Sequence, residues 1–157
     1  MTAVHDPCMT LKERITEDMK AALRAGEKQR LATVRLALAA IRQREIDERI
    51  TLDDGQALAV LEKMIKQRKE AITQFQAGGR ADLVAKEGAE ITVLETYLPA
   101  RMSDAELDTL IAGAIAATGA TSAKDMGKVM SLVKSQAQGR VDMGTVSARV
   151  KEKLVPP

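Results

Sequence analysis

Apolar side chains recur every three or four residues along nearly the whole chain, which is the spacing of helices with one buried face. Capping signals divide this pattern into segments: Thr10 with Glu13 forms a capping box before the first helix, and Gly26 marks its end. Three more helices are expected before Pro99, which disfavours helical geometry at the residue preceding it. They cover about residues 27–49, about residues 54–76 after a cap at 51–54, and about residues 81–98.

A domain boundary is expected at residues 98–102, and three shorter helices follow it. Their start and stop signals are Ser103 with Glu106, Gly119, Ser122 with Asp125, Gly139, and Asp142. No segment has the alternation of a strand, so the sequence predicts an all-α fold. Residues 1–9 are expected to form a disordered extension, residues 10–98 an N-terminal four-helix domain, and residues 99–157 a C-terminal three-helix domain hinged to it.

Two glycines fall inside the last two predicted helices. Gly127 lies in a helix interior, where glycine costs about 1 kcal/mol relative to alanine. We therefore expect a neighbouring helix to approach closely at Gly127, with Gly144 on the other side of the same contact.

Aromatic side chains are nearly absent, since only Phe75 and Tyr97 occur among 157 residues and there is no Trp. With 45% hydrophobic residues, the core must consist of Leu, Ile, Val, Met and Ala, a composition that favours helices over sheets. No apolar run approaches the length of a membrane span, so no membrane partner is expected. Cys8 is the single cysteine and the first residues lack a signal-peptide pattern, so a reducing, cytoplasmic location is expected.

Basic side chains form two groupings, although the formal net charge is only +2. From Lys124 onward there are seven basic and three acidic residues, a local balance of +4 that favours an anionic partner. In the second predicted helix a basic residue recurs every seven positions, forming a slanting stripe about 30 Å long. Its members are Lys28, Arg35, Arg42 and Arg49. This stripe is either a track for phosphates or a solvated face with local pairs from Arg42 and Arg49 to Glu45.

Signals for catalysis are missing from the sequence. His5 is the only histidine and lies in the N-terminal extension, and no serine or cysteine of the chain has a nucleophile motif around it. There is no Walker loop and no acidic cluster with metal-ligand spacing. We therefore expect no catalytic residue, no cofactor, no metal and no independent catalysis.

Five stretches occur in an order typical of a known family: Leu11-Lys12-Glu13-Arg14-Ile15, Lys66-Gln67-Arg68-Lys69-Glu70, Tyr97-Leu98-Pro99, Asp125-Met126-Gly127-Lys128-Val129-Met130 and Gly139-Arg140-Val141-Asp142. Together they resemble the GatB/YqeY family over residues 11–154. The chain departs from that pattern at Met143, where many members have a glycine directly after the aspartate.

The resemblance implies a stand-alone protein similar to the tail of the B subunit of the glutamine-dependent aspartyl/glutamyl-tRNA amidotransferase. In that enzyme the ATP-using and ammonia-generating sites lie elsewhere, and the tail is associated with gripping tRNA. Carbon–nitrogen ligase activity with glutamine as amido-N-donor is therefore implied only by association. The partners implied are a tRNA, an amidotransferase or an aminoacyl-tRNA synthetase.

Two functions are compatible with the sequence. The first is a tRNA-binding or amidotransferase-associated module that contacts phosphates through five basic residues, with no base stacking because aromatics are scarce. These residues are Lys128, Lys134, Arg140, Arg149 and Lys151. The second is a helical protein–protein interaction module without RNA binding, in which the basic residues serve solubility. Salt dependence distinguishes the two, because phosphate contacts release counterions.

Overall fold

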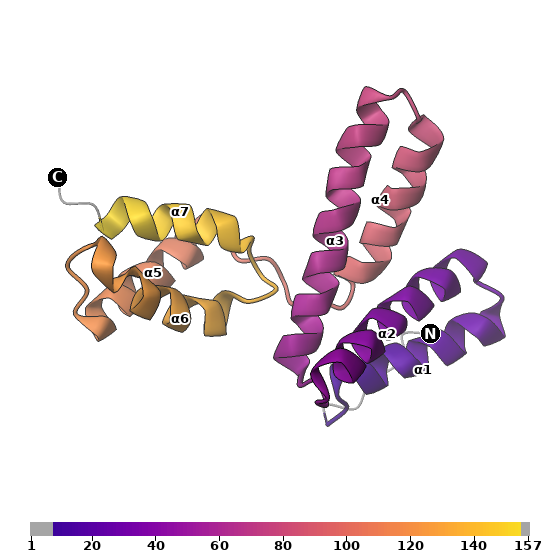
Figure 1. Ribbon diagram of the computed structural model, residues 1–157, viewed down its shortest axis with the longest axis horizontal. Helices are drawn as coiled ribbons and strands as arrows, with labels where there is room; N and C mark the ends of the chain where they lie inside the picture. The colour runs from indigo at the N-terminus through magenta and orange to yellow at the C-terminus, as the bar shows by residue number, and fades with distance from the viewer. Residues whose placement is uncertain (1–7, 155–157) are drawn as a thin grey trace. The chain divides into compact units, whose positions relative to one another are not determined.

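The structure is a computed structural model that describes residues 8–154, and within this range it has seven α-helices, one short 3-10 turn and no strand (Figure 1). The predicted all-α fold is confirmed. The chain divides into two compact units, residues 1–98 and 99–157. Most of the extension expected at residues 1–9 lies outside the described residues, and the hinge at residues 98–102 stays a prediction.

The N-terminal unit consists of two helical hairpins. Its helices are α1 (Leu11–Ala25), α2 (Lys28–Glu48), α3 (Asp54–Ala77) and α4 (Ala81–Glu95). α1 packs along α2, α3 packs along α4, and α2 contacts both helices of the second hairpin. The turn between α3 and α4 lies at the end of that hairpin farthest from α1 and α2 (Figure 1). In the part of the chain described, no helix is long and apolar enough to cross a membrane.

Local sequence explains where these helices begin and end. Thr10 accepts a hydrogen bond from the Glu13 backbone N–H while the Glu13 carboxylate accepts one from the Thr10 N–H, so the predicted capping box is confirmed. Asp53 and Gln56 form an equivalent box at the start of α3. Gly26 ends α1 at a φ of 72°, a left-handed conformation that glycine adopts without steric cost.

The core of the N-terminal unit is aliphatic, as the composition predicts. Its fully buried large side chains come from all four helices: Ile15, Val34, Ile41, Leu61 and Leu94. The only buried aromatic in the described residues is Tyr97, which is 4% exposed. Phe75, near the far end of the α3–α4 hairpin, is only partly buried.

A buried polar contact joins the end of α4 to α1. The Tyr97 hydroxyl donates a hydrogen bond of 2.7 Å to the Asp18 carboxylate. The Arg14 guanidinium lies 5.1 Å from the centroid of the Tyr97 ring and donates to the Thr96 carbonyl at 3.0 Å. Burial, together with the hydrogen bond to the Asp18 carboxylate, raises the pKa of Tyr97 well above its usual 10.

Ion pairs made by Arg68 and Lys12 connect neighbouring helices of the same unit. Arg68 on α3 lies 2.8 Å from the Glu90 carboxylate on α4, and both side chains are largely buried. Lys12 on α1 donates to Glu45 on α2. This hydrogen bond, with a second one from the Leu52 backbone N–H, lowers the pKa of Glu45 below its usual value.

The C-terminal unit is built around α6, which packs against both of its neighbours. The unit contains α5 (Asp104–Thr118), the 3-10 turn η1 (Ala123–Asp125), α6 (Met126–Ala137) and α7 (Met143–Leu154). Its core is again aliphatic, with six fully buried large side chains: Leu107, Ile111, Val129, Val133, Val146 and Val150. The buried face predicted for the last helix, Val146, Val150 and Leu154, is confirmed.

The expected close contact at two glycines is wrong. A methyl group added at Gly127 would meet no atom within 4 Å, so no neighbouring helix requires glycine there. At Gly144 the added group would lie 3.0 Å from Asp142 Oδ2, the oxygen that accepts the Thr145 backbone N–H at 3.2 Å. Gly144 therefore leaves room for the carboxylate that caps α7, and the predicted cap at Asp142 is confirmed.

Titration of Tyr97 tests the buried contact in the N-terminal unit. Because Tyr97 is the only tyrosine and there is no Trp, absorbance at 295 nm reports this phenol alone. We expect its midpoint to lie above pH 10 in the folded protein and near 10 in urea. A pKa raised by folding stabilises the folded state below pH 10 and loses that contribution as pH rises further. Equal midpoints in folded and unfolded protein would contradict the contact.

Candidate nucleic-acid interface

The five predicted phosphate-binding residues lie on three segments of the C-terminal unit. Lys128 and Lys134 project from α6, Arg149 and Lys151 from α7, and Arg140 lies in the turn between these helices. The three lysines are exposed, whereas the two arginines are partly buried. The lysines and the arginines of this set therefore differ in their exposure to solvent.

Arg149 connects α7 to the first turns of α5. Its guanidinium lies 2.9 Å from the Asp104 carboxylate and 3.0 Å from the Asp108 carboxylate. A planar guanidinium can donate to several oxygens at once, which suits a link of this kind. Arg149 therefore has a structural role that does not depend on a ligand.

Arg140 holds the turn between α6 and α7 against the segment before α5. Its carbonyl accepts a hydrogen bond of 2.8 Å from the Met102 backbone N–H, and its Nε donates to the Ala100 carbonyl at 2.9 Å. Its Nη2 donates to the Glu106 carboxylate at 3.0 Å. The expected capping box at Ser103 is thus only half formed: Ser103 accepts the Glu106 backbone N–H, but the Glu106 carboxylate binds Arg140.

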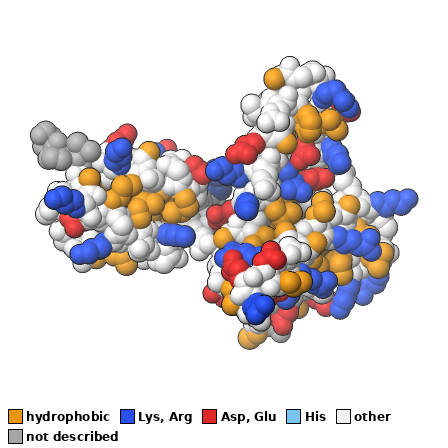
Figure 2. Space-filling view, in the orientation of Figure 1, with side chains coloured by type: hydrophobic (Ala, Val, Ile, Leu, Met, Phe, Trp, Pro, Cys, Tyr) orange, Lys and Arg blue, Asp and Glu red, His pale blue; other side chains and the backbone are white. Residues whose placement is uncertain are grey.

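The lysines of this unit face solvent. Among residues 8–154 none of them makes an ion pair: Lys124, Lys128, Lys134, Lys151 and Lys153. Lys128 and Lys134 are six residues apart, so they point roughly 120° apart around α6. On the face shown in Figure 2 the blue side chains of this unit are dispersed, not gathered in one patch. The surface therefore offers separate point charges to an extended anion.

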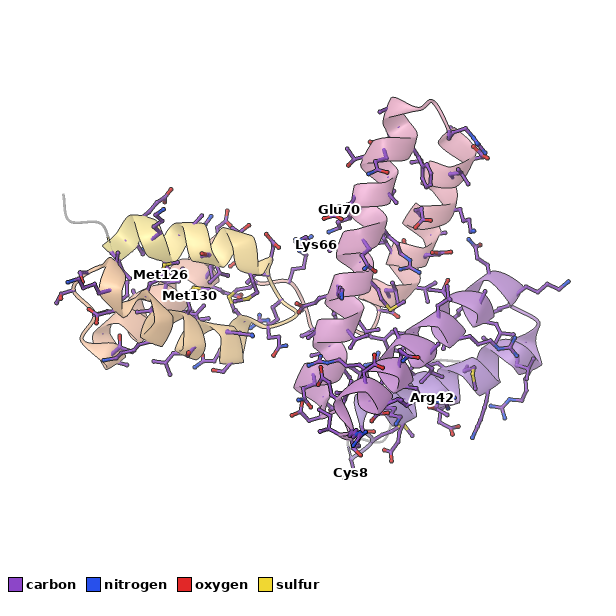
Figure 3. All side chains as sticks on the ribbon, in the orientation of Figure 1. Cys8, Arg42, Lys66, Glu70, Met126 and Met130 are labelled. Atoms are coloured by element: carbon purple, nitrogen blue, oxygen red, sulfur yellow. The ribbon has the colours of Figure 1, made fainter. Side chains whose placement is uncertain are left out.

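The basic stripe on α2 is also exposed, and the local pairs considered for it do not form. Glu45 is occupied by Lys12 and the Leu52 N–H, so neither Arg42 nor Arg49 pairs with it. Within the described range, all four members of the stripe are exposed and without an ion pair: Lys28, Arg35, Arg42 and Arg49. Figure 3 labels Arg42 on α2.

Metal-ligating side chains are dispersed among residues 8–154. No group of three His, Cys, Asp or Glu side chains is placed to hold a metal ion there. His5 lies outside the described residues. An open hollow of about 560 Å³ in the C-terminal unit is lined by Arg101, Asp104, Arg140 and Asp142, among others. Within it the Arg140 guanidinium is already hydrogen-bonded, and the Thr145 hydroxyl donates at 3.3 Å to the Asp142 carboxylate that caps α7.

Comparison with known proteins identifies the family. A family model described as "Yqey-like protein" matches residues 12–154, which include all seven helices almost in full. The chain belongs to the YqeY-like family. The resemblance inferred from the five sequence stretches is confirmed.

Several fungal relatives share the name "Altered inheritance of mitochondria protein 41, mitochondrial". The protein of Pyrenophora tritici-repentis is 32% identical over 145 residues, which are 88% of this chain and 78% of the relative. That of Kluyveromyces lactis is 39% identical over 84 residues, 53% of this chain and 45% of the relative. A Saccharomyces cerevisiae protein is 34% identical over 92 residues, 58% of this chain and 50% of the relative. The match thus spans about half the length of the latter two relatives.

These relatives contradict the localisation expected from the sequence. Their names describe mitochondrial proteins, so the expectation of a cytoplasmic protein is wrong by this comparison. The expectation rested on the single cysteine and on the lack of a signal-peptide pattern. A reducing compartment does not single out the cytoplasm, which is why this reasoning failed.

Two neighbouring residues of α7 allow a direct test of the structural role of Arg149. Replacing Arg149 with Gln should lower the free energy of unfolding of the C-terminal unit by about 1 kcal/mol, because two partly exposed ion pairs are lost. Replacing the exposed Lys151 with Gln should cost under about 0.5 kcal/mol. Amide hydrogen exchange in α7 measures both values. Equal protection in the two variants would show that the Arg149 contacts do not stabilise the unit.

Proposed function

We propose that the C-terminal unit binds tRNA through its exposed lysines and serves as an accessory module of an amidotransferase-type reaction. The main support for this proposal is that two arginines of this unit form ion pairs within it, whereas its lysines form none among residues 8–154. Arg140 and Arg149 are engaged by Glu106, Asp104 and Asp108. The lysines of α6 and α7 are left with their full charge facing solvent.

This arrangement suits recognition of a phosphate backbone. A lysine ammonium is a compact charge on a flexible stem, so separate lysines can each meet a phosphate without a preformed pocket. Each contact releases condensed counterions and adds affinity that falls with salt. The described part of this unit contains no aromatic side chain, since Phe75 and Tyr97 both belong to the N-terminal unit. Recognition would therefore be of backbone and shape, without base stacking.

The link to an amidotransferase comes from the family resemblance. In the enzyme that the chain resembles, a tail of this kind is separate from the sites that use ATP and release ammonia. A protein with the tail alone would hold tRNA and leave the chemistry to a partner. The lack of a metal-holding group of side chains within residues 8–154 is compatible with this division.

Removing the three lysines that were predicted to bind phosphates tests the RNA-binding role. Replacing Lys128, Lys134 and Lys151 with Ala should weaken tRNA binding and reduce the slope of log affinity against log salt by about two to three units, up to one per lost contact. Filter binding or fluorescence anisotropy at several salt concentrations measures both quantities. Arg140 is left intact, because its loss would disturb the turn before α7.

A matched variant controls for the loss of three positive charges. Lys63, Lys66 and Lys69 are also exposed but lie on α3 in the N-terminal unit. Their replacement with Ala should leave the tRNA affinity and the salt slope nearly unchanged. If both triple variants behave alike, the attraction is not specific to the C-terminal unit and this proposal fails.

The isolated protein should not catalyse amide transfer. Purified protein given misacylated tRNA, glutamine and ATP should release no amidated aminoacyl-tRNA, because in the enzyme that the chain resembles those sites lie outside the tail. Thin-layer chromatography of the deacylated amino acid measures the product. Turnover without added subunits would show that this chain carries an active site of its own.

A further inference from the structure

The outer face of α2 carries a row of exposed aliphatic side chains. Leu36 is 48% exposed, Ile46 is 69% exposed and Ile50, just beyond the helix end, is 41% exposed. Ala32 and Ala39 are also exposed on this face, and the polar Gln43, which donates to the Asp47 carboxylate at 2.8 Å, lies between Ala39 and Ile46. The buried residues of α2 lie on the opposite side of the helix, so the row cannot contribute to the core of the unit.

A row of arginines borders this apolar row along one edge. Arg35 and Arg42 are rotated about 60° and about 80° around the helix from the mean direction of Leu36 and Ile46. Arg49 lies at the helix end, and in the described range none of the three arginines has an ion-pair partner. Orange and blue side chains lie side by side over α2 in Figure 2.

Arg49 occupies a backbone conformation that favours glycine. It has a φ of 56°, and it is the one non-glycine residue with positive φ in the described chain. Arginine is uncommon in this left-handed region, which costs a residue with a Cβ about 1–2 kcal/mol. Glycine at position 49 would make the folded state more stable, yet the chain has an arginine there, at the end of the exposed basic row.

We propose that this face of α2 is a docking site for an amphipathic helix of a partner protein that carries acidic residues along one edge of its apolar face. Large and small side chains occur together on this face, with Leu36 between Ala32 and Ala39, and such differences in size form the ridges and grooves that a second helix fills. The helical part of the row, from Ala32 to Ile46, is about 21 Å long, which is enough for a partner of about four turns. Carboxylates along one edge of that helix would face the three arginines.

Other occupants fit these observations less well. A two-fold, antiparallel pairing of two copies through α2 would place the arginine edge of one copy against that of the other. An anionic membrane favours a wide face with bulky residues, whereas this row is narrow and contains alanines. RNA phosphates would satisfy the arginines but would leave the aliphatic row exposed to water.

A pair of synthetic helical peptides provides the probe. Both contain about three heptads with Leu and Ile on the apolar face, and they carry either Glu or Lys along the edge that would meet the arginines. Fluorescence anisotropy with the full-length protein should show binding of the Glu peptide and none of the Lys peptide. Ile46→Asp should weaken binding by about tenfold or more, and Arg42→Glu by about fivefold. Leu23→Asp, on an exposed apolar residue of α1 outside the row, should change nothing.

A variant at Arg49 separates binding from folding. Arg49→Gly should raise the urea midpoint of unfolding, because the left-handed conformation is relieved, and should still weaken binding of the Glu peptide. A loss of affinity in this variant therefore cannot come from a damaged fold. An unchanged circular dichroism spectrum of Ile46→Asp would show in the same way that its loss of affinity does not come from a damaged fold.

Several results would overturn the proposal. They are an absence of Glu-peptide binding, equal binding of the two peptides, or insensitivity to Ile46→Asp and Arg42→Glu. Binding of phosphatidylserine vesicles or of tRNA that depends on Ile46 would assign the face to a membrane or to RNA instead. A concentration-dependent dimer that Ile46→Asp abolishes would assign it to a second copy of this chain.

Discussion

The hydrogen bond between Tyr97 and Asp18 closes the N-terminal unit. Aliphatic side chains drive the four helices together, but they are similar in shape and specify few unique partners. The buried phenol and carboxylate are different, because each would be costly to leave unpaired. Their contact joins the first helix to the residues that follow the fourth, so it fixes where the chain leaves the unit, two residues before Pro99.

Arginines perform similar linking roles in both units. Arg14 lies over the Tyr97 ring, Arg68 joins α3 to α4, and Arg140 and Arg149 hold the C-terminal unit together. The sequence stretches that carry the family resemblance contain all of these except Arg149, together with Tyr97 and the capping Asp142. These stretches are therefore markers of the fold. The residues available for a partner lie mostly outside them, on α2 and on the lysine-bearing faces of α6 and α7.

Helix positions, caps and buried faces could be predicted from the sequence because each depends on residues within one or two turns. Gly26, the Thr10 box and the buried valines of α7 are examples. The roles of Arg140 and Arg149 could not be predicted in this way, because their carboxylate partners lie 34 and 41 residues away along the chain. The same limit explains the error at Gly127, since periodicity does not reveal how closely two helices approach.

The exposed aliphatic face of α2 could not be predicted from the sequence either. Its regular apolar positions account for the core, and the further aliphatic residues look like ordinary variation until their exposure is known. Single exposed leucines or isoleucines are common and need no explanation. Here the exposed aliphatic side chains share one face of the helix with Gln43, they lie opposite the core, and arginines without ion pairs in the described structure border them. Contact with water does not stabilise the exposed aliphatic side chains, and the arginines do not stabilise one another. A partner helix that buries the aliphatic side chains and carries carboxylates opposite the arginines would stabilise both groups.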